Sequence, residues 1–301
     1  MAAPTSPARA ARPVPGGPPP APTVQHVLVT YAKRGRMRFA SHRDVGRAFE
    51  RAVRRAGLPM AHSAGFNPHP KISYASGTPT GVASEAEYLS LALTATQDPV
   101  RLRRVLDTAL PDGIDVIEVR EDSGGTLNGR LMASEWLVEL PGITPAAAEV
   151  AVRTFLAAAD VHVERLTNKG VRRLDARGAV LAIELDQRAC DAYPGDGGIL
   201  RMVVRHTEPA VRPEDVLTAL RQVAGVVPAS PAIVTRVAQG MVGGDGTVRL
   251  PAAGADPRSA TAPDPQAPTV PDAQAPETSG APAPEQHAHA GAPAPEHKDV
   301  P

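Results

Sequence analysis

The sequence predicts a mixed α+β fold made of two tandem ferredoxin-like halves, residues 24–122 and 131–238. Stretches with alternating apolar and polar residues, typical of strands, recur along the chain between amphipathic stretches typical of helices. Their order in the first half is βαββαβ, and nearly the same order follows in the second half. This order places two helices on one face of a four-stranded antiparallel sheet.

The first half opens with the strand pattern QHVLVTYA. Ser41 is then a suitable helix N-cap, and Asp44, three residues later, can complete a capping box. The predicted helix runs from about residue 42 to 56 and is ended by Gly57 and Pro59. The other expected elements are strands at 71–76 and 85–94, a helix at 99–110 and a strand at 114–119.

The second half repeats this plan with one strand too many. Thr144 is the expected N-cap of its first helix, and Pro145 occupies the first helical position. Two strand patterns, at 161–166 and 179–186, compete for one place in the sheet, and the sequence leaves this choice open. The other expected elements are strands at 134–140, 200–206 and 231–237 and helices at 144–159 and 213–223.

Both ends of the chain differ in composition from the middle. Residues 1–22 are mostly Ala, Pro, Gly and Arg, and residues 239–301 combine Ala, Pro and Gly with acidic side chains. Segments of this kind bury too little apolar surface to offset the loss of chain entropy on folding. We therefore expect a disordered N-terminus over 1–22 and a disordered acidic tail over 239–301.

Positive charge is concentrated in one segment, although the whole chain has 32 basic and 32 acidic residues. Between Lys33 and Lys71, 10 basic residues oppose 2 acidic ones, which leaves a local charge of +8. Helical periodicity places the arginines of residues 42–56 opposite the apolar side of that helix. A local basic surface of this kind is typical of proteins that bind anions. The predicted nucleic-acid-binding residues are Lys33, Arg36, Arg38, Arg43, Arg47, Arg51, Arg54 and Lys71.

The motif GFNPHP at residues 65–70 predicts a stiff loop. Gly65 permits positive φ, while the two prolines hold Asn67 and His69 in extended conformations. A loop that is already ordered loses little entropy when it binds, so Gly65, Asn67 and His69 are predicted to orient a ligand. The alternative is a purely structural loop with Phe66 packed into the core.

Cysteine content excludes several classes of site. Cys190 is the single cysteine, so this chain alone holds no disulfide framework and no four-cysteine zinc site. The histidines show no recognised spacing of metal ligands, and we expect neither a metal nor another cofactor. No apolar run approaches the ~18 residues of a membrane span, and the start of the sequence lacks the apolar core of a signal peptide. The expectation is therefore a cytoplasmic protein.

Five motifs together resemble the bacterial radical-SAM-associated, or radical-SAM-linked, proteins. They are KRG at 33–35, RFASHRD at 38–44, RRAGLP at 54–59, GFNPHPKIS at 65–73 and GVASEAEY at 81–88, with a weaker match, KGVRRLDARG, at 169–178. Members of that family are fused to, or encoded beside, a radical SAM protein, so the resemblance implies a radical SAM partner in trans. Such an enzyme holds its cluster with three closely spaced cysteines, so this chain is not itself one.

These observations predict a non-catalytic accessory protein that works with a separate radical SAM enzyme and binds RNA, or an RNA-linked assembly, through its basic surface. Whether the protein is an enzyme stays open, because His42 and His69 could instead act as general acid and base in a metal-independent RNA endonuclease. A third interpretation has the basic surface dock on an acidic protein. The predicted RNA-binding surface combines the helix arginines and the 65–71 loop on one outward face.

Overall fold

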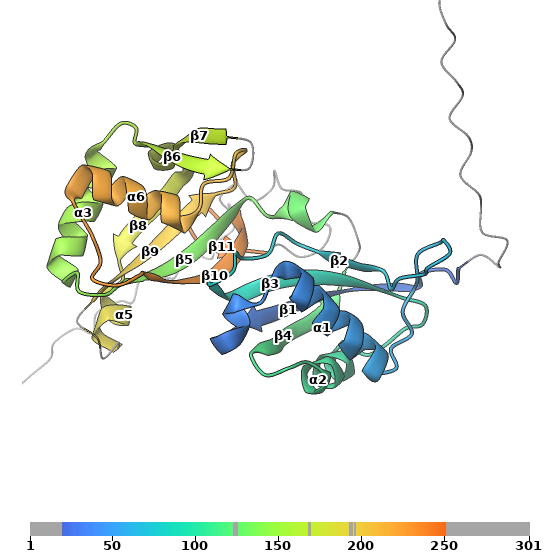
Figure 1. Ribbon diagram of the computed structural model, residues 1–301. Coiled ribbons are helices and arrows are strands. Elements are labelled where there is room, and N and C mark those ends of the chain that lie inside the picture. Colours follow the sequence, from blue (N-terminus) through green and yellow to red (C-terminus); the bar gives the residue numbers. More distant parts are fainter. Residues whose placement is uncertain (1–19, 123–125, 168–169, 193–194, 196, 251–301) are drawn as a thin grey trace, which may run out of the picture. The chain divides into compact units, whose positions relative to one another are not determined.

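The computed structural model describes residues 20–122, 126–167, 170–192, 195 and 197–250 (Figure 1). It is a mixed α+β structure with a large, mostly antiparallel sheet. Most of the two ends predicted to be disordered, residues 1–19 and 251–301, lies outside the described residues. In the part of the chain that is described, no helix is long and apolar enough to cross a membrane.

The first half begins with β1 (Gln25–Lys33), a short 3₁₀ helix η1 (Gly35–Phe39) and α1 (His42–Arg55). The predicted capping box at α1 is confirmed: the Ser41 hydroxyl accepts a hydrogen bond from the Asp44 N–H, and the Asp44 carboxylate accepts one from the Ser41 N–H. The remaining elements are β2 (Ile72–Tyr74), β3 (Ala83–Leu93), α2 (Pro99–Ala109) and β4 (Ile114–Glu121).

A second 3₁₀ helix, η2 (Leu127–Arg130), leads into the second half. Its sheet strands are β5 (Ala133–Leu140), β8 (Val180–Leu185), β9 (Gly198–Arg205) and β10 (Ile233–Val242). Its longer helices are α3 (Pro145–Ala157) and α6 (Pro213–Ala224). The smaller elements are β6 (His162–Thr167), β7 (Gly170–Asp175), α4 (Ala176–Ala179), α5 (Gln187–Ala192) and β11 (Val248–Arg249).

The large sheet has the strand order β4-β1-β3-β10-β5-β9-β8, with β2 added to β3 and β11 to β10. The competition between two strand patterns is resolved: β8 joins the large sheet, whereas β6 and β7 form a separate hairpin. The two halves meet where β10 runs parallel to the start of β3, pairing Thr235 with Ala83 and Arg236 with Ser84.

The domain boundary predicted at residue 238 falls inside β10, which continues to Val242. Gln239 is fully buried, its side-chain amide donates to the Ala86 carbonyl at 2.6 Å, and its own carbonyl accepts from the Tyr88 hydroxyl at 3.3 Å. Gln239 and Gly240 interrupt the alternation typical of a strand, so this extension depends on pairing with β5 and β11.

In the first half, α1 and α2 cover one face of the sheet (Figure 1). Alternate residues of each strand point toward them, including Val29 of β1 and Leu91 of β3, which pack with Phe49 of α1. The next residue along β1, Leu28, points to the opposite face and packs with Leu127 of η2. One part of the opposite face is therefore covered by this second, smaller cluster.

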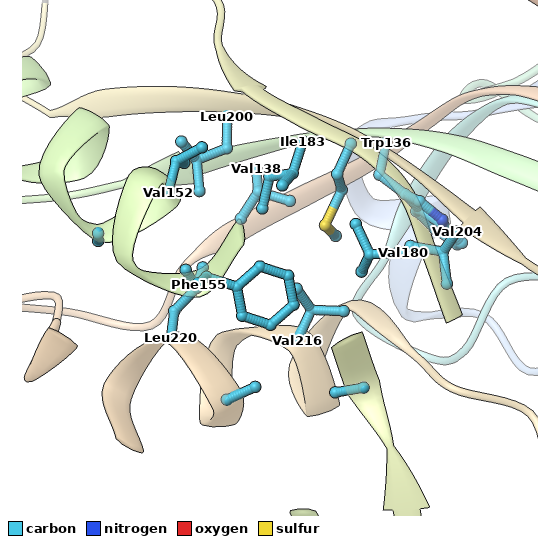
Figure 2. Close-up of a cluster of buried hydrophobic side chains, with 14 of the residues drawn as sticks. Trp136, Val138, Val152, Phe155, Val180, Ile183, Leu200, Val204, Val216 and Leu220 are labelled. Carbon is cyan, nitrogen blue, oxygen red and sulfur yellow. The ribbon is translucent and has the colours of Figure 1, made fainter. Parts of the chain in front are cut away.

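The second half has its own apolar core between the sheet and the helices α3 and α6. Figure 2 shows Phe155 of α3 beside Val216 and Leu220 of α6, facing strand residues such as Val138 and Ile183. Phe155, Val216 and Leu220 are fully buried. Burial of apolar side chains of this size contributes about 1.5–3 kcal/mol each, so this core stabilises the half strongly.

Candidate anion-binding surfaces

The outer face of α1 carries an unbalanced row of arginines. Its inner face buries apolar residues such as Val45, Phe49 and Val53, so the helical period turns the arginines outward. The row consists of Arg43, Arg47, Arg51 and Arg54, and all four are exposed. We call these four residues the α1 arginine row. The structure thus places the predicted helix residues on one exposed face.

The charges of the α1 arginine row are largely uncompensated. Arg47 lies 3.9 Å from the Asp44 carboxylate, with both side chains more than half exposed. An exposed pair of this kind contributes little, typically 0–1 kcal/mol. Within the described residues, Arg43, Arg51 and Arg54 form no ion pair. Their guanidinium groups are therefore available to an external anion.

A groove of about 590 Å³ lies between α1 and α2, with three arginines in its wall. Arg55 comes from the end of α1, and Arg101 and Arg104 come from α2. We call this feature the α1–α2 groove. The sequence-based prediction missed Arg101 and Arg104 because it considered charge between residues 33 and 71. Their exposed positions on an amphipathic helix were the available signal.

Lys33 was predicted to lie on the basic surface, and this is wrong. Its side chain is 3% exposed, and its ammonium donates to the carbonyls of Thr78 and Pro79 at 3.3 and 3.5 Å. Burial lowers the pKa of this lysine. The strand period already indicated this orientation, because Lys33 continues the inward series of Val29 and Tyr31 along β1.

The two predicted arginines of η1 have different environments. Arg36 is exposed and has no ion-pair partner among the described residues. Arg38 is half-buried, and its guanidinium lies 4.7 Å from the centre of the Phe39 ring. The Nε of Arg38 is buried and has no hydrogen-bond partner in the described part of the chain. Arg36 can therefore add to an external positive field, whereas Arg38 is partly engaged within the fold.

A buried ion pair joins the halves beside Lys33. Glu87 of β3 and Arg236 of β10 are each 3% exposed, and a guanidinium nitrogen of Arg236 lies 2.7 Å from Glu87 Oε1. Glu87 Oε1 also accepts hydrogen bonds from the backbone N–H and hydroxyl of Thr78. The sequence did not indicate this pair, because 149 residues separate its two members.

His42 lies at the rim of this buried pair. Its ring packs edge-on against Tyr74, with 5.3 Å between ring centres. Gly77 lies directly beneath it, since a Cβ on Gly77 would be 3.0 Å from His42 Cδ2 and 3.5 Å from Glu87 Oε2. Glycine at position 77 therefore leaves the space that the imidazole ring uses.

The structure does not bring His42 and His69 together. His69 precedes Tyr74, the contact of His42, by five residues along a segment that pairs with β3. His69 lines a pocket on the face of the sheet away from the helices, whereas Tyr74 packs toward α1. A general acid and base must both reach the same phosphate, and this geometry does not favour such a pair.

The 65–71 loop faces away from the helices. Ile72 and Tyr74 of β2 pack toward α1, so the alternate residues Lys71 and Ser73 point to the other face of the sheet. His69 and Lys71 line a pocket of about 320 Å³ on that face. The expectation that the arginine row and the loop share one surface is therefore wrong.

The structure confirms the positive φ predicted at Gly65 but not the alternative packing of the loop. Gly65 has a φ of 136°, a conformation that side chains disfavour. Phe66 is 73% exposed, so the interpretation of this loop as a brace with Phe66 in the core is wrong. Asn67 and His69 are exposed, as a ligand-contacting role requires. In the described ranges, no group of three or more His, Cys, Asp or Glu side chains is arranged to hold a metal ion.

Two solved structures are similar to this chain at low identity. One is the crystal structure of a Cbf5-Nop10-Gar1 complex, with a TM-score of 0.39, 12% identity, and coverage of 71% of this chain and 48% of that chain. The other is an archaeal box H/ACA sRNP Nop10-Cbf5 complex, with a TM-score of 0.37, 14% identity, and coverage of 72% and 49%. The chain thus spans about half the length of each matched chain, and a likeness at this level carries no functional argument.

None of the curated proteins matches the chain in sequence. A family model does match, over residues 26–213, which is well over half of the chain. The matched range contains α1, α2, the buried Glu87 and the 65–71 loop, together with most of the second half. The chain therefore belongs to the family described as uncharacterized protein conserved in bacteria (DUF2344).

Proposed function

We propose that this protein is a non-catalytic accessory protein that binds RNA through the α1 arginine row and the α1–α2 groove. One observation carries the proposal: the row is exposed and has Asp44 as its single ion-pair partner among the described residues. The groove adds three further arginines to the same pair of helices. Asp44 is thus the single carboxylate that forms an ion pair with the row among the described residues, and most of the positive charge stays available.

Arginine suits this role because its planar guanidinium can donate two parallel hydrogen bonds to one phosphate. Binding to single-stranded RNA releases counterions, and the logarithm of affinity falls with the logarithm of salt by about 0.7 for each phosphate neutralised. If the four arginines of the row each meet a phosphate, the slope is about −3. The proposal therefore predicts strong salt dependence and little preference for base sequence.

The architecture proposed for the whole chain is a pair of ferredoxin-like halves. The first half has the strand order β4-β1-β3 with β2 on β3, and the second has β10-β5-β9-β8, which supports the same βαββαβ plan in each. A radical SAM protein in trans, acting with this chain in the cytoplasm, is also part of the proposal. It rests on the resemblance of the motifs described above and on no contact in the structure.

The direct test measures the affinity of the full chain for a fluorescent single-stranded RNA by anisotropy at several salt concentrations. Arg47→Glu/Arg51→Glu should weaken binding about a hundredfold at low salt and make the slope less negative by about 1.4, because two phosphate contacts are lost. The matched control is Arg205→Glu/Arg221→Glu, which reverses two exposed arginines of the second half that form no described ion pair. Equal losses of RNA affinity in both variants would show that net charge, and not the α1 arginine row, determines binding.

Two further measurements separate the competing functions. RNA incubated with the protein in EDTA should stay intact, whereas cleavage that His42→Ala abolishes would establish the endonuclease instead. Pull-down from cell extract, with and without nuclease treatment, tests whether the protein binds a radical SAM protein directly or through RNA. Capture of a radical SAM protein that survives nuclease treatment would support a direct protein contact, and loss of all partners after treatment would support RNA as the link.

A further inference from the structure

A pocket lined by both polar and apolar residues lies on the face of the first-half sheet opposite α1 and α2. Its polar side chains come from β1, from the loop that follows α1, and from the β2 and β3 segments; they are His26, Ser63, His69, Lys71, Ser73 and Ser90. Pro70, Ile72 and Ala92 complete the lining. The pocket measures about 320 Å³, near the lower end of the ~300–1,000 Å³ typical of small-molecule sites. It lies on the opposite side of the sheet from the arginine row, so it is a separate site.

The pocket wall is held in place by hydrogen bonds on both sides of the loop. The Lys71 N–H donates to the Ala61 carbonyl at 2.7 Å, and the Lys71 carbonyl accepts from the Ala92 N–H at 3.1 Å. His69 is fixed to Ser63 twice, since its N–H donates to the Ser63 hydroxyl at 3.1 Å and its carbonyl accepts from the Ser63 N–H at 2.9 Å. A wall fixed in this way loses little entropy on binding.

The chemistry of the lining favours an anion. Lys71 brings an ammonium, His26 and His69 bring imidazoles, and the three serines bring hydroxyls, while no carboxylate belongs to the lining. Among the described residues, the side chains of Lys71, His26 and His69 have neither a hydrogen-bond nor an ion-pair partner. Their donors are therefore free to meet a ligand with several acceptor oxygens.

The geometry points to a phosphomonoester as the ligand of this pocket. Donors arrive from three chain segments around one small space, which suits a tetrahedral group with acceptors in several directions better than a planar carboxylate. The phosphate can belong to a small molecule or to the end of an RNA strand. Lys71 supplies the charge that fixes the phosphate, and His69 supplies a directed donor from the stiff loop.

Titration calorimetry of the full chain with inorganic phosphate and with adenosine monophosphate tests this assignment. Both should bind, and Lys71→Met, which keeps most of the side-chain stem, should weaken both about tenfold, the effect of losing one charge-assisted hydrogen bond. Arg221→Met, a cation removed from α6, should leave both affinities unchanged. His69→Gln gives a second variant, with circular dichroism to verify that each protein is folded.

The result that overturns the assignment is absence of binding by either anion, or equal affinities for the folded wild-type and Lys71→Met proteins. The site is also distinct from the proposed RNA surface, so Arg47→Glu/Arg51→Glu should leave phosphate binding unchanged. If that pair abolished it, the phosphate would be bound at α1 and the pocket would be excluded. Weak RNA binding by the wild type together with tight phosphate binding would refute the proposed function alone.

The source of the phosphate is resolved with one RNA oligonucleotide made with a 5′-phosphate and with a 5′-hydroxyl. Tighter binding of the phosphorylated strand by the wild type, lost in Lys71→Met, identifies an RNA end as the ligand. Equal binding of the two strands, with retained binding of adenosine monophosphate, identifies a small phosphorylated molecule. Either result supports the pocket as a phosphomonoester site.

Discussion

The first helices of the two halves are alike inside and different outside. Both α1 and α3 begin at a side-chain cap and bury one phenylalanine completely, Phe49 in α1 and Phe155 in α3. On the outside, α1 presents its arginine row, whereas α3 presents the ion pair of Arg153 with Glu149 at 3.0 Å and the half-exposed Val150. Packing constrains the inner positions of both helices, so their outer positions are where the charges differ.

A similar contrast separates the charges within the fold from those at its surface. The ion pair of Glu87 with Arg236 is buried at the junction of the halves, while the pair of Glu149 with Arg153 is exposed on α3. Charges removed from water are costly when they are left unpaired, and exposed charges are not. Disrupting each pair should therefore have very different consequences.

The largest effect is expected for Arg236→Met. This change removes the guanidinium that Glu87 contacts directly and leaves only the nearby Lys33 ammonium. Breaking a buried pair typically costs about 3–5 kcal/mol of unfolding free energy. Arg153→Met is the control and should cost less than about 1 kcal/mol. Urea denaturation measures both, and similar losses for the two variants would show that the junction pair does not hold the halves together. The double variant Glu87→Leu/Arg236→Met should cost less than the sum of the single changes.

The next prediction tests whether arginines added to the outer face of α3 give this helix the RNA affinity expected of α1. Val150→Arg/Thr154→Arg places two arginines one helical turn apart on the exposed face of α3. If uncompensated arginine is what matters, RNA affinity should rise, and the salt slope should become more negative by about 0.7 for each new phosphate contact. Val150→Gln/Thr154→Gln is the uncharged control. No change in the arginine variant would mean that the shape of the α1–α2 groove is also required.

A smaller effect concerns the helix caps. Ser41 forms a reciprocal capping box with Asp44, whereas the Thr144 hydroxyl accepts a single hydrogen bond, from the Ala147 N–H. Ser41→Ala should cost about 1 kcal/mol of unfolding free energy, and Thr144→Ala should cost less. Ser41→Asn keeps a side-chain acceptor and should restore most of the loss. A lower melting temperature for Thr144→Ala than for Ser41→Ala in thermal denaturation would show that the capping box does not add stability.

The smallest effect is a pH dependence in the second half. His206 has Nδ1 2.9 Å from the Leu131 carbonyl and Nε2 2.7 Å from the Ser134 hydroxyl. Partial burial of its ring and the positive charge of Arg236 lower its pKa. The unfolded chain takes up this proton near pH 6.5, whereas the folded protein resists it. Its contribution to stability is therefore present above about pH 6.5 and is lost as the pH falls toward the lower folded pKa.

His206→Gln should show a shallower loss of unfolding free energy between pH 7.5 and 5.5 than the wild type, even if it is less stable at both values. His62→Gln changes a histidine of the first half whose ring has no hydrogen-bond partner among the described residues, and it should follow the wild-type profile. Parallel profiles for the wild type and His206→Gln in urea denaturation would exclude His206 as the source of the slope.

Much of the fold could be predicted from the local sequence. Alternation predicted β1, β3 and β5, and the helical period predicted which arginines of α1 face outward. The end of β10 was missed because Gln239 and the glycines after it lack a strand pattern, and their pairing depends on strands far away in the chain. Lys33 was misplaced because its charge was given more weight than the strand period, which already turned it inward.

By itself, the sequence determined most of the longer helices and strands, the caps and the concentration of arginine on α1, because these depend on residues within a few positions of one another. Tertiary structure alone decided three things. It paired Glu87 with Arg236, it joined α2 arginines to the end of α1 in one groove, and it turned Lys71 and His69 to the face opposite the helices. The reason is that a strand presents alternate residues to two faces, and which of these faces the helices cover is settled by packing across the whole sheet.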